Sequence, residues 1–337
     1  LSYASNRITL EQATLDFGTG RGRVEASGLL ELRGDPLAAA FGAGGLRPTR
    51  TEGTLSVELR DLSQLPIPGA SDLRLGGALR LDLTATGSLS QPDLEGRLEW
   101  TEGAFQSAGG PPVRAIDLAV TLRSARIEIP RFQAEVGAAP IRISGKPALG
   151  GLPTADPSEL DLPPGVIDLD LLDLTRTRID LWISGRDALF LRTAVVPSLR
   201  ATLGVGLQGT LREPRVEGEV ELVRGRVEYQ LPIPVSLSGG SGPTVRGSGF
   251  QIPGVDLPEL TSGLVGDPTL DLRIRTPTQD PVEFRSNIAS GDIGVDLQIL
   301  GTLAQPAPDG VVSITEGFAV LTTTTITLRS ALVDFDP

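Results

Sequence analysis

Apolar and polar residues alternate with a period of two along most of the chain. Clear runs of this kind are Leu55–Leu59, Leu79–Leu83, Ile167–Leu171 and Ile293–Ile299. Such alternation is typical of a β-strand with one apolar and one polar face, and the Gly, Pro, Asp and Ser residues between the runs favour turns. Only residues 36–41 have the pattern of a helix, and of one short turn at most. We therefore predict an all-β fold.

Three proline-rich segments interrupt this alternation. They are residues 109–112, 150–165 and 231–268. The strand pattern resumes unchanged after each of them, so we predict surface excursions rather than linkers between domains.

A ten-residue block with the pattern Gly-[Ser/Thr]-Leu-x-x-Pro-x-x-[Glu/Asp]-Gly occurs three times. It begins at Gly87, Gly209 and Gly301, with separations of 122 and 92 residues. A further glycine follows each block seven residues later, at Gly103, Gly225 and Gly317. Because the separations differ, we predict a meandering sheet with recurring turns rather than a solenoid of fixed period.

Apolar positions flank each block in the same register. Counted from the first glycine of the block, these positions have even offsets before the block and odd offsets after it. This switch predicts a hairpin whose two strands keep their apolar side chains on one face. Polar neighbours such as Arg80 and Asp82 would lie on the opposite face. The apolar positions are Leu81, Leu83, Leu98 and Trp100 around the first block, Leu203, Val205, Leu207, Val220 and Leu222 around the second, and Val295, Leu297, Ile299, Val312 and Ile314 around the third.

These blocks resemble those of the TamB family, the inner-membrane component of the translocation and assembly module, within the AsmA-like superfamily. The segments Ile183–Leu189, Arg285–Gly291 and Thr315–Leu328 add to the resemblance. It is close over residues 166–337 and looser over residues 1–130. We expect residues 1–165 to form an upstream β-groove segment and residues 166–337 a TamB-like C-terminal domain, in one continuous sheet.

The resemblance implies a long, twisted, taco-shaped sheet, antiparallel and meandering, whose concave face is an apolar groove. It also implies a place in the periplasm of a diderm bacterium, with an inner-membrane anchor that would precede this segment. The expected partners are phospholipid and an outer-membrane β-barrel protein of the TamA or BamA type. The roles proposed for the family are phospholipid transport between the two membranes and help in assembling outer-membrane β-barrels or autotransporters.

Composition favours an open sheet over a sandwich or a closed barrel, whose core would be filled by its own side chains. Aromatic residues make up only 4 % of the chain, and 41 glycines and 27 prolines leave few bulky side chains for such a core. At about 13 residues per strand and turn, the chain would form about 25 strands and a sheet about 120 Å long.

The chain contains no histidine and no cysteine and has a formal net charge of −12. The first two absences exclude Ser-His-Asp and Cys-His catalysis and nearly all zinc and iron sites. The negative charge disfavours a nucleic-acid partner, which requires a basic surface. The chain also lacks methionine, so we expect it to be part of a longer protein. No signal peptide or membrane-spanning run is visible.

Other candidate chemistry is weaker. Asp168, Asp170 and Asp173 could suggest calcium, but carboxylates two residues apart on a strand more often share one solvated face. The glycine-rich runs at residues 18–22 and 42–45 lack a complete dinucleotide motif, and Lys146 lacks the upstream glycine of a P-loop. Nothing marks a pair of glycosidase carboxylates. We predict a protein that is not an enzyme and has no cofactor or metal.

The function favoured by the sequence is a phospholipid conduit, with the 14 apolar positions above as groove candidates. The alternative for each of these residues is an ordinary core position, because core and groove share the same alternation. The alternatives for the whole chain are an assembly factor that templates outer-membrane strands at an exposed sheet edge, and a passive scaffold spanning the envelope.

Overall fold

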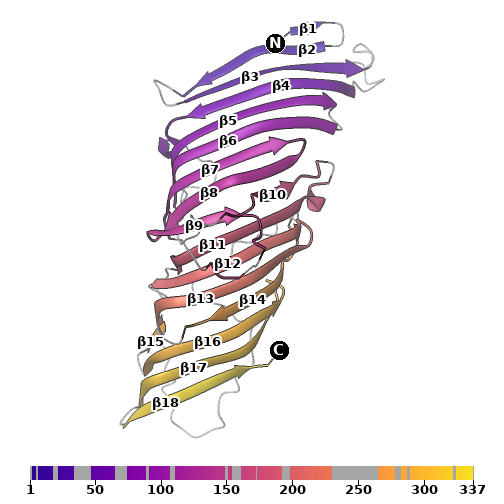
Figure 1. Cartoon of the computed structure of the whole chain (residues 1–337). Helices are drawn as coiled ribbons and strands as arrows, with labels where there is room; N and C mark the ends of the chain where they lie inside the picture. Colours follow the sequence, from indigo (N-terminus) through magenta and orange to yellow (C-terminus); the bar gives the residue numbers. More distant parts are fainter. Residues whose placement is uncertain are drawn as a thin grey trace, which may run out of the picture.

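The computed structural model is one elongated, curved β-sheet (Figure 1). Its described residues form 18 strands and two short 3₁₀ turns, which confirms the predicted all-β meander. The predicted helical turn at residues 36–41 lies outside the described residues, as do parts of the three proline-rich segments. The described residues are 2–4, 7–17, 22–33, 47–64, 74–88, 91–106, 111–148, 151–153, 161–171, 173–191, 198–229, 265–277, 282–286, 289–321 and 324–336.

The strands follow one another down the sheet in nearly the order of the sequence. The first half contains β1 (Ser2–Ala4), β2 (Arg7–Asp16), β3 (Gly22–Arg33), β4 (Arg47–Leu59), the 3₁₀ turn η1 (Leu62–Gln64), β5 (Arg74–Ser88), β6 (Gln91–Gln106), β7 (Val113–Arg123), β8 (Arg126–Val136) and β9 (Ala139–Ser144). The second half contains β10 (Gly165–Asp168), the 3₁₀ turn η3 (Leu174–Arg176), β11 (Arg178–Leu191), β12 (Ser198–Thr210), β13 (Pro214–Tyr229), β14 (Thr269–Arg275), β15 (Val282–Ser286), β16 (Ala289–Gly301), β17 (Pro306–Leu321) and β18 (Thr324–Phe335).

Two positions in the sheet are each shared by two short strands. β9 and β10 both lie between β8 and β11, and both run antiparallel to these neighbours. They therefore form one strand that is interrupted at Gly145 and resumes at Gly165. The second shared position, between β13 and β16, is filled by β14 and β15.

The pairing of β13 with β14 and β15 is parallel, whereas every other pairing in the described part of the sheet is antiparallel. β13 ends at Tyr229, and β14 starts beside Arg215, near the beginning of β13. The chain has thus returned to the N-terminal end of β13 before it forms β14. A parallel pair of this kind requires a long connection between the two strands. The proline-rich segment at residues 231–268 falls within that connection.

The estimate of about 25 strands was too high. The 18 described strands occupy 16 positions because of the two shared ones, which corresponds to a sheet about 75 Å long. The estimate failed because several strands are long, with 16 residues in β6, β13 and β17.

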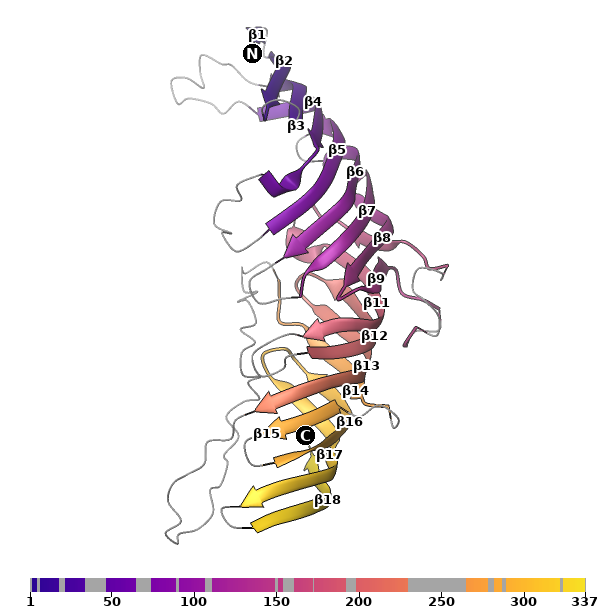
Figure 2. The same cartoon turned by 90° about the vertical axis from the view of Figure 1, so that its left-hand side faces the viewer.

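A line of β-bulges follows one long edge of the sheet. Glu102, Ala115, Asp187 and Glu316 have left-handed φ angles of 49° to 52°, and each lies where the strand pairing shifts register. Since neighbouring strands run in opposite directions, the ends of β6, β11 and β17 and the start of β7 meet at the same edge. Bulges bend and twist strands, and Figure 2 shows the resulting curvature.

The sheet is a single layer with little enclosed core. Most apolar side chains of the described strands are half-buried rather than buried. A small buried cluster of Ala201, Leu203 and Val220 lies on β12 and β13. β1 and β18 lie at opposite ends of the sheet in Figure 1. Among the described residues, no helix is long and apolar enough to cross a membrane.

Candidate functional site

Each of the three sequence blocks forms the predicted hairpin turn. The first glycine pairs with the proline in all three: Gly87 with Pro92, Gly209 with Pro214 and Gly301 with Pro306. These glycines have φ angles of 95°, 99° and 88°, a conformation that favours glycine because side chains with a Cβ are strained there. The block is thus the turn that holds each hairpin in register.

The flanking apolar residues pair directly across these hairpins. Leu81 pairs with Leu98 around the first block, Leu203 with Val220 around the second and Val295 with Val312 around the third. Residues paired directly across two strands point to the same side of a sheet. The parity switch in the sequence therefore corresponds to a shared face, as predicted.

These pairs continue from hairpin to hairpin as apolar rows. We call the side of the sheet that carries them the apolar face, and the other side the outer face. One row crosses most of the sheet: Ala26, Leu55, Leu83, Gly96, Leu122, Ile127, Ile167, Ile179, Gly209 and Pro214. It passes through β10, so the interruption of the shared strand does not break it. None of its ten members is charged.

Further rows contain the remaining candidates. In the first half these are Val24, Val57, Leu81, Leu98 and Val120, and then Leu59, Leu79, Trp100, Leu118 and Phe132. The second half has two long rows, Ile143, Ile183, Val205, Gly218, Leu272, Ile299 and Pro308, and then Ile141, Gly185, Leu203, Val220, Ile274, Leu297, Gly310 and Phe335. Two shorter rows lie mainly on β11 to β13: Leu181, Leu207, Val216 and Leu270, and then Ala188, Ala201 and Leu222. Two more lie on β15 to β18: Val282, Ile293, Ile314 and Ala331, and then Val295, Val312 and Val333. All 14 predicted residues thus lie on one face.

The exposure of these residues differs from that of a filled core. Only Leu203 and Val220 are buried, at 8 % and 7 % relative exposure. The other twelve candidates are half-buried. A core residue that is enclosed on all sides typically loses nearly all of its accessible surface. The candidates are therefore covered by their neighbours in the sheet but remain partly accessible.

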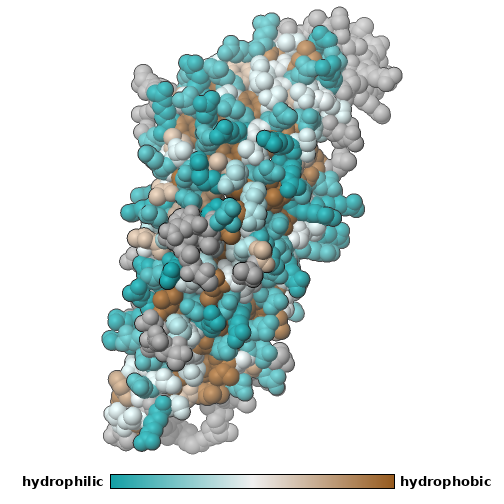
Figure 3. All heavy atoms as spheres, viewed as in Figure 1, coloured by the Kyte–Doolittle hydropathy of each residue, from teal (hydrophilic) through white to brown (hydrophobic). Residues whose placement is uncertain are grey.

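The outer face carries the charged side chains. Arg80 donates to Asp82 at 3.0 Å, and the hydroxyl of Ser56 donates to the same carboxylate at 2.8 Å. The Ser56 hydrogen bond and then the Arg80 interaction hold the pKa of Asp82 below its ordinary value. Farther down the sheet, Arg275 forms ion pairs with two glutamates of β13. Figure 3 shows this face as mostly hydrophilic, with hydrophobic side chains visible between the polar ones.

The sequence pattern did not reveal that Trp182 is a buried residue of the outer face. Its side chain is only 3 % exposed. It packs over the neighbouring strand, where a Cβ added to Gly204 or Gly206 would lie 3.1 Å or 2.9 Å from its ring. The available signal was a Gly-x-Gly spacing, at Gly204 and Gly206, together with a large apolar residue at a position where alternation predicts a polar one.

A short segment lies over this tryptophan region. It consists of residues 145–148 and 151–153, which we call the covering segment. Lys146 forms an ion pair with Glu217 on β13, and the backbone of Gly151 lies against Gly204. Beneath it, Ser184 is buried at 2 % exposure and its Oγ has no hydrogen-bond partner in the described structure. The covering segment therefore forms a local second layer on the outer face. Its contacts through Lys146 and Gly151 do not involve the apolar rows.

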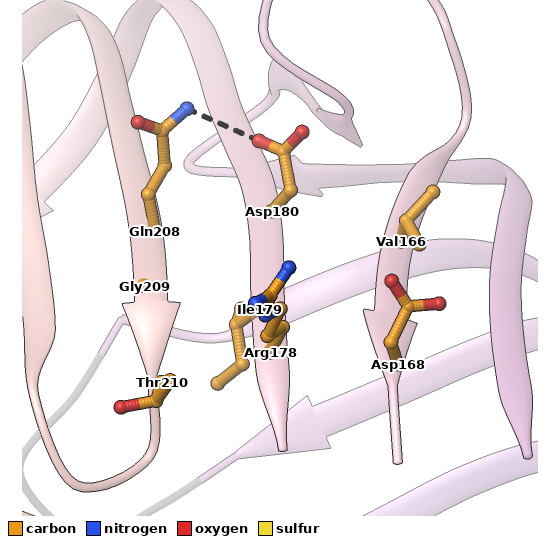
Figure 4. A pocket seen from close by; sticks show the side chains of 8 residues that line it. All are labelled: Val166, Asp168, Arg178, Ile179, Asp180, Gln208, Gly209 and Thr210. Atoms are coloured by element: carbon orange, nitrogen blue, oxygen red, sulfur yellow. Dashed lines mark hydrogen bonds between the residues drawn. The ribbon is translucent and has the colours of Figure 1, made fainter. Parts of the chain in front are cut away.

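A shallow hollow of about 340 Å³ opens on the outer face near the ends of β10, β11 and β12. Figure 4 shows its lining, in which Gln208 donates to Asp180 at 3.1 Å. Asp168, which also lines it, accepts from Arg126 at 3.2 Å. The polar side chains of the hollow lie on the side opposite the apolar rows, although Ile179 and Gly209 of one row also line it.

The three aspartates considered for calcium do not form a shared site. Asp168 ends β10, whereas Asp170 and Asp173 lie in the turn that follows. The prediction that these aspartates share one face of a strand is therefore wrong. Asp173 caps η3, where it accepts hydrogen bonds from the backbone and hydroxyl of Thr175. The hydroxyl bond is the main reason that the pKa of Asp173 is lowered. Within the described residues, no group of His, Cys, Asp or Glu has a metal-binding arrangement.

The model for the TamB C-terminal domain family matches residues 165–336, slightly more than half of the chain. This chain belongs to the TamB family. The match begins at the first residue of β10 and covers the second and third hairpin blocks, so it includes ten of the 14 candidate residues. No curated protein and no solved structure matches the chain. TamB proteins are generally non-catalytic and are associated with the periplasm and inner membrane of diderm bacteria, where TamA is their general partner.

Proposed function

We propose that the apolar face of this TamB-family chain holds the acyl chains of phospholipids and lets them move along the sheet between two membranes. No bond is made or broken in this process. The observation that carries the proposal is the row from Ala26 to Pro214, which is uncharged and crosses the interrupted strand without a gap. A continuous surface of this kind is what a sliding acyl chain requires.

We infer that the apolar face is the concave one. The covering segment contacts the outer face through Lys146 and Gly151. In Figure 2 the segment that follows β9 lies on the convex side of the curved sheet. The apolar rows would then line the inside of the curve, where side chains from both long edges approach an acyl chain together.

Exposing a phospholipid acyl chain to water has a high free-energy cost. Each CH₂ group costs about 0.8 kcal/mol, so a 16-carbon chain costs on the order of 12 kcal/mol. Half-buried Leu, Val and Ile side chains along the rows would offset much of this cost at each position. Because the rows are chemically uniform, no position would hold the chain much more tightly than the next. The charged headgroup would stay in water at the open side.

The position of the protein in the cell follows from the same proposal. The sheet would stand in the periplasm, attached to the inner membrane by an N-terminal anchor and in contact with an outer-membrane β-barrel protein of the TamA or BamA type. The described sheet, about 75 Å long, would supply a section of the path. Residues 1–165 would extend the same surface upstream of the family domain.

The test is whether the purified chain carries diacyl lipid, measured by native mass spectrometry and lipid extraction. We expect bound phospholipid in the wild type. Leu207→Arg, on the apolar face, should abolish it, whereas Gln208→Arg, one residue away on the outer face, should not. Both variants should keep the circular dichroism spectrum of the wild type. A lipid-free wild type, or equal effects of the two arginines, would contradict the proposal.

The rival role, assembly of outer-membrane β-barrels, gives the opposite pattern. An assembly factor that pairs nascent strands with a sheet edge depends on backbone hydrogen bonds rather than on the apolar face. β18 has only one neighbour, β17, in the described sheet. A proline in β18 should then impair barrel assembly in cells, and Leu207→Arg should leave it intact.

A further inference from the structure

The hairpin of β17 and β18 ends in an unusual stretch of sequence. No charged residue occurs from Phe318 to Leu328, and the run is bounded by Glu316 and Arg329. Its residues are apolar or threonine throughout. We call the described residues of this stretch, 318–321 and 324–328, the hairpin tip.

The hairpin tip has apolar side chains on both faces of the sheet. Phe318 and Val320 lie on the outer face, where they pair with threonines, and they are 50 % and 43 % exposed. Ile326 pairs with Ala319 on the apolar face and is 43 % exposed. Earlier in β17 the outer face carries polar residues such as Asp309. The tip therefore combines exposed apolar side chains on both faces with a sequence that has no charge, unlike the earlier part of β17.

Within the described residues, the hairpin tip also extends beyond the strand β16 beside it. The last pair between β16 and β17 is Ala289 with Ala319, but β17 and β18 continue to the pairs Val320–Thr325 and Leu321–Thr324. Two residues beyond the neighbouring strand correspond to about 7 Å of projection. Figure 1 shows the β17–β18 end protruding at one long edge of the sheet.

We propose that the hairpin tip inserts into the interfacial region of a phospholipid bilayer. A protein partner would cover one face of a strand pair, whereas a bilayer surrounds both, and both faces carry exposed apolar side chains here. The projection of about 7 Å matches the depth of 5–10 Å at which apolar groups settle at the boundary of headgroups and acyl chains. Deeper insertion is disfavoured, since strand edges with open backbone groups are not stable in hydrocarbon.

Charge on the protein supports an apolar rather than an electrostatic contact. The chain has a formal net charge of −12, so anionic lipid headgroups would repel it as a whole. Neutral zwitterionic vesicles are therefore the appropriate probe. This inference goes beyond the proposed transport function, and it requires no lipid in the apolar rows.

The first experiment is flotation of the 337-residue chain with vesicles of phosphatidylcholine. We expect the wild type to float with the vesicles equally at low and high salt. Phe318→Asp and Val320→Asp should each lower the partition coefficient about tenfold or more, because burying one large apolar side chain is worth about that factor. Leu332→Asp is the matched control, because Leu332 is 65 % exposed on the same face of β18 but lies far from the tip.

The second experiment uses the absence of cysteine in the chain. Single cysteines at positions 320, 332 and 105 can carry an environment-sensitive fluorophore without side reactions. On addition of vesicles, the label at 320 should shift to the blue, and the labels at 332 and 105 should not. Phe105 is a suitable reference because it is exposed near the same edge of the sheet, on β6.

The outcomes separate this inference from the transport proposal. Leu207→Arg should float like the wild type even though it carries no lipid, and Val320→Asp should carry lipid although it no longer floats. A wild type that does not float, equal shifts at positions 320 and 332, or flotation unaffected by both aspartates would overturn the inference.

Discussion

Gly218 lies directly opposite Val205 in the β12–β13 hairpin, with a φ of 144°. A Cβ at this position would lie 2.8 Å from the Cα of Val205 and would also clash with the carbonyl of Gly204. The other two blocks repeat this arrangement, with Gly96 opposite Leu83 and Gly310 opposite Leu297. The last glycine of each block thus leaves room for close approach to the strand that carries the apolar residue opposite it.

Gly218→Val should therefore destabilise the protein by about 1–3 kcal/mol, because it adds a side chain at a left-handed position with no space for it. Urea unfolding followed by circular dichroism measures this change. Gly76→Ala is the matched control, since its Cβ would meet only the Cβ of Ala104, at 3.3 Å. If Gly218→Val lowers the free energy of unfolding no more than Gly76→Ala does, the close backbone approach at Gly218 does not require a glycine there.

Local sequence patterns were sufficient to predict the hairpins and their faces. The Gly-to-Pro spacing fixed the turns, and the parity of Leu81 and Leu98 indicated that these residues share a face. Both signals act between residues that are close in the chain, so hydrogen bonding within one hairpin determines the outcome. The same reasoning placed the charged residues Arg80 and Asp82 on the opposite face.

Features that depend on distant parts of the chain could not be predicted in this way. The return of the chain beside Arg215, which makes β14 parallel to β13, depends on where a long connection ends. The resumption of β9 as β10 at Gly165 depends on β8 and β11 leaving a place for it. The burial of Trp182 could not be predicted, because alternation alone does not reveal that the covering segment lies above that position.

Trp182→Ala should lower the free energy of unfolding by about 3–5 kcal/mol, the range for removing a buried large side chain. The reason is that the ring is 3 % exposed between the sheet and the covering segment. Trp100→Ala should cost less, since Trp100 is only half-buried. Thermal and urea unfolding of the two variants provide the comparison. An equal or smaller effect at position 182 would mean that the covering segment does not protect the ring in solution.

Ser56→Ala should raise the pKa of Asp82 toward its ordinary value, because the Ser56 hydroxyl is the main group that lowers it. A carboxylate whose pKa is lowered by folding stabilises the protein above its ordinary pKa, and this contribution is lost as the pH falls through the pKa of the folded state. The variant should therefore lose stability at a higher pH than the wild type.

Carboxyl NMR titration of Asp82 measures this shift directly. Thr54→Ala is the control, since the Thr54 hydroxyl lies on the same strand but pairs with Ser27 instead. The stability difference should be small, because the side chain of Asp82 is 48 % exposed. An unchanged Asp82 titration in Ser56→Ala would exclude the hydroxyl as the cause.

The two tryptophans offer a direct readout of lipid on the apolar face, because the chain contains only two and they lie on opposite sides. Trp100 belongs to an apolar row and donates from its ring nitrogen to the carbonyl of Gly76 at 2.9 Å, whereas Trp182 lies on the outer face. Trp182→Phe leaves only Trp100 to fluoresce, and Trp100→Phe leaves only Trp182. After loading with phosphatidylcholine brominated on its acyl chains and removal of vesicles, Trp100 should be strongly quenched and Trp182 should not. Bromine quenches only at short range, so equal quenching of both rings, or of neither, would mean that acyl chains do not occupy the apolar rows beside Trp100.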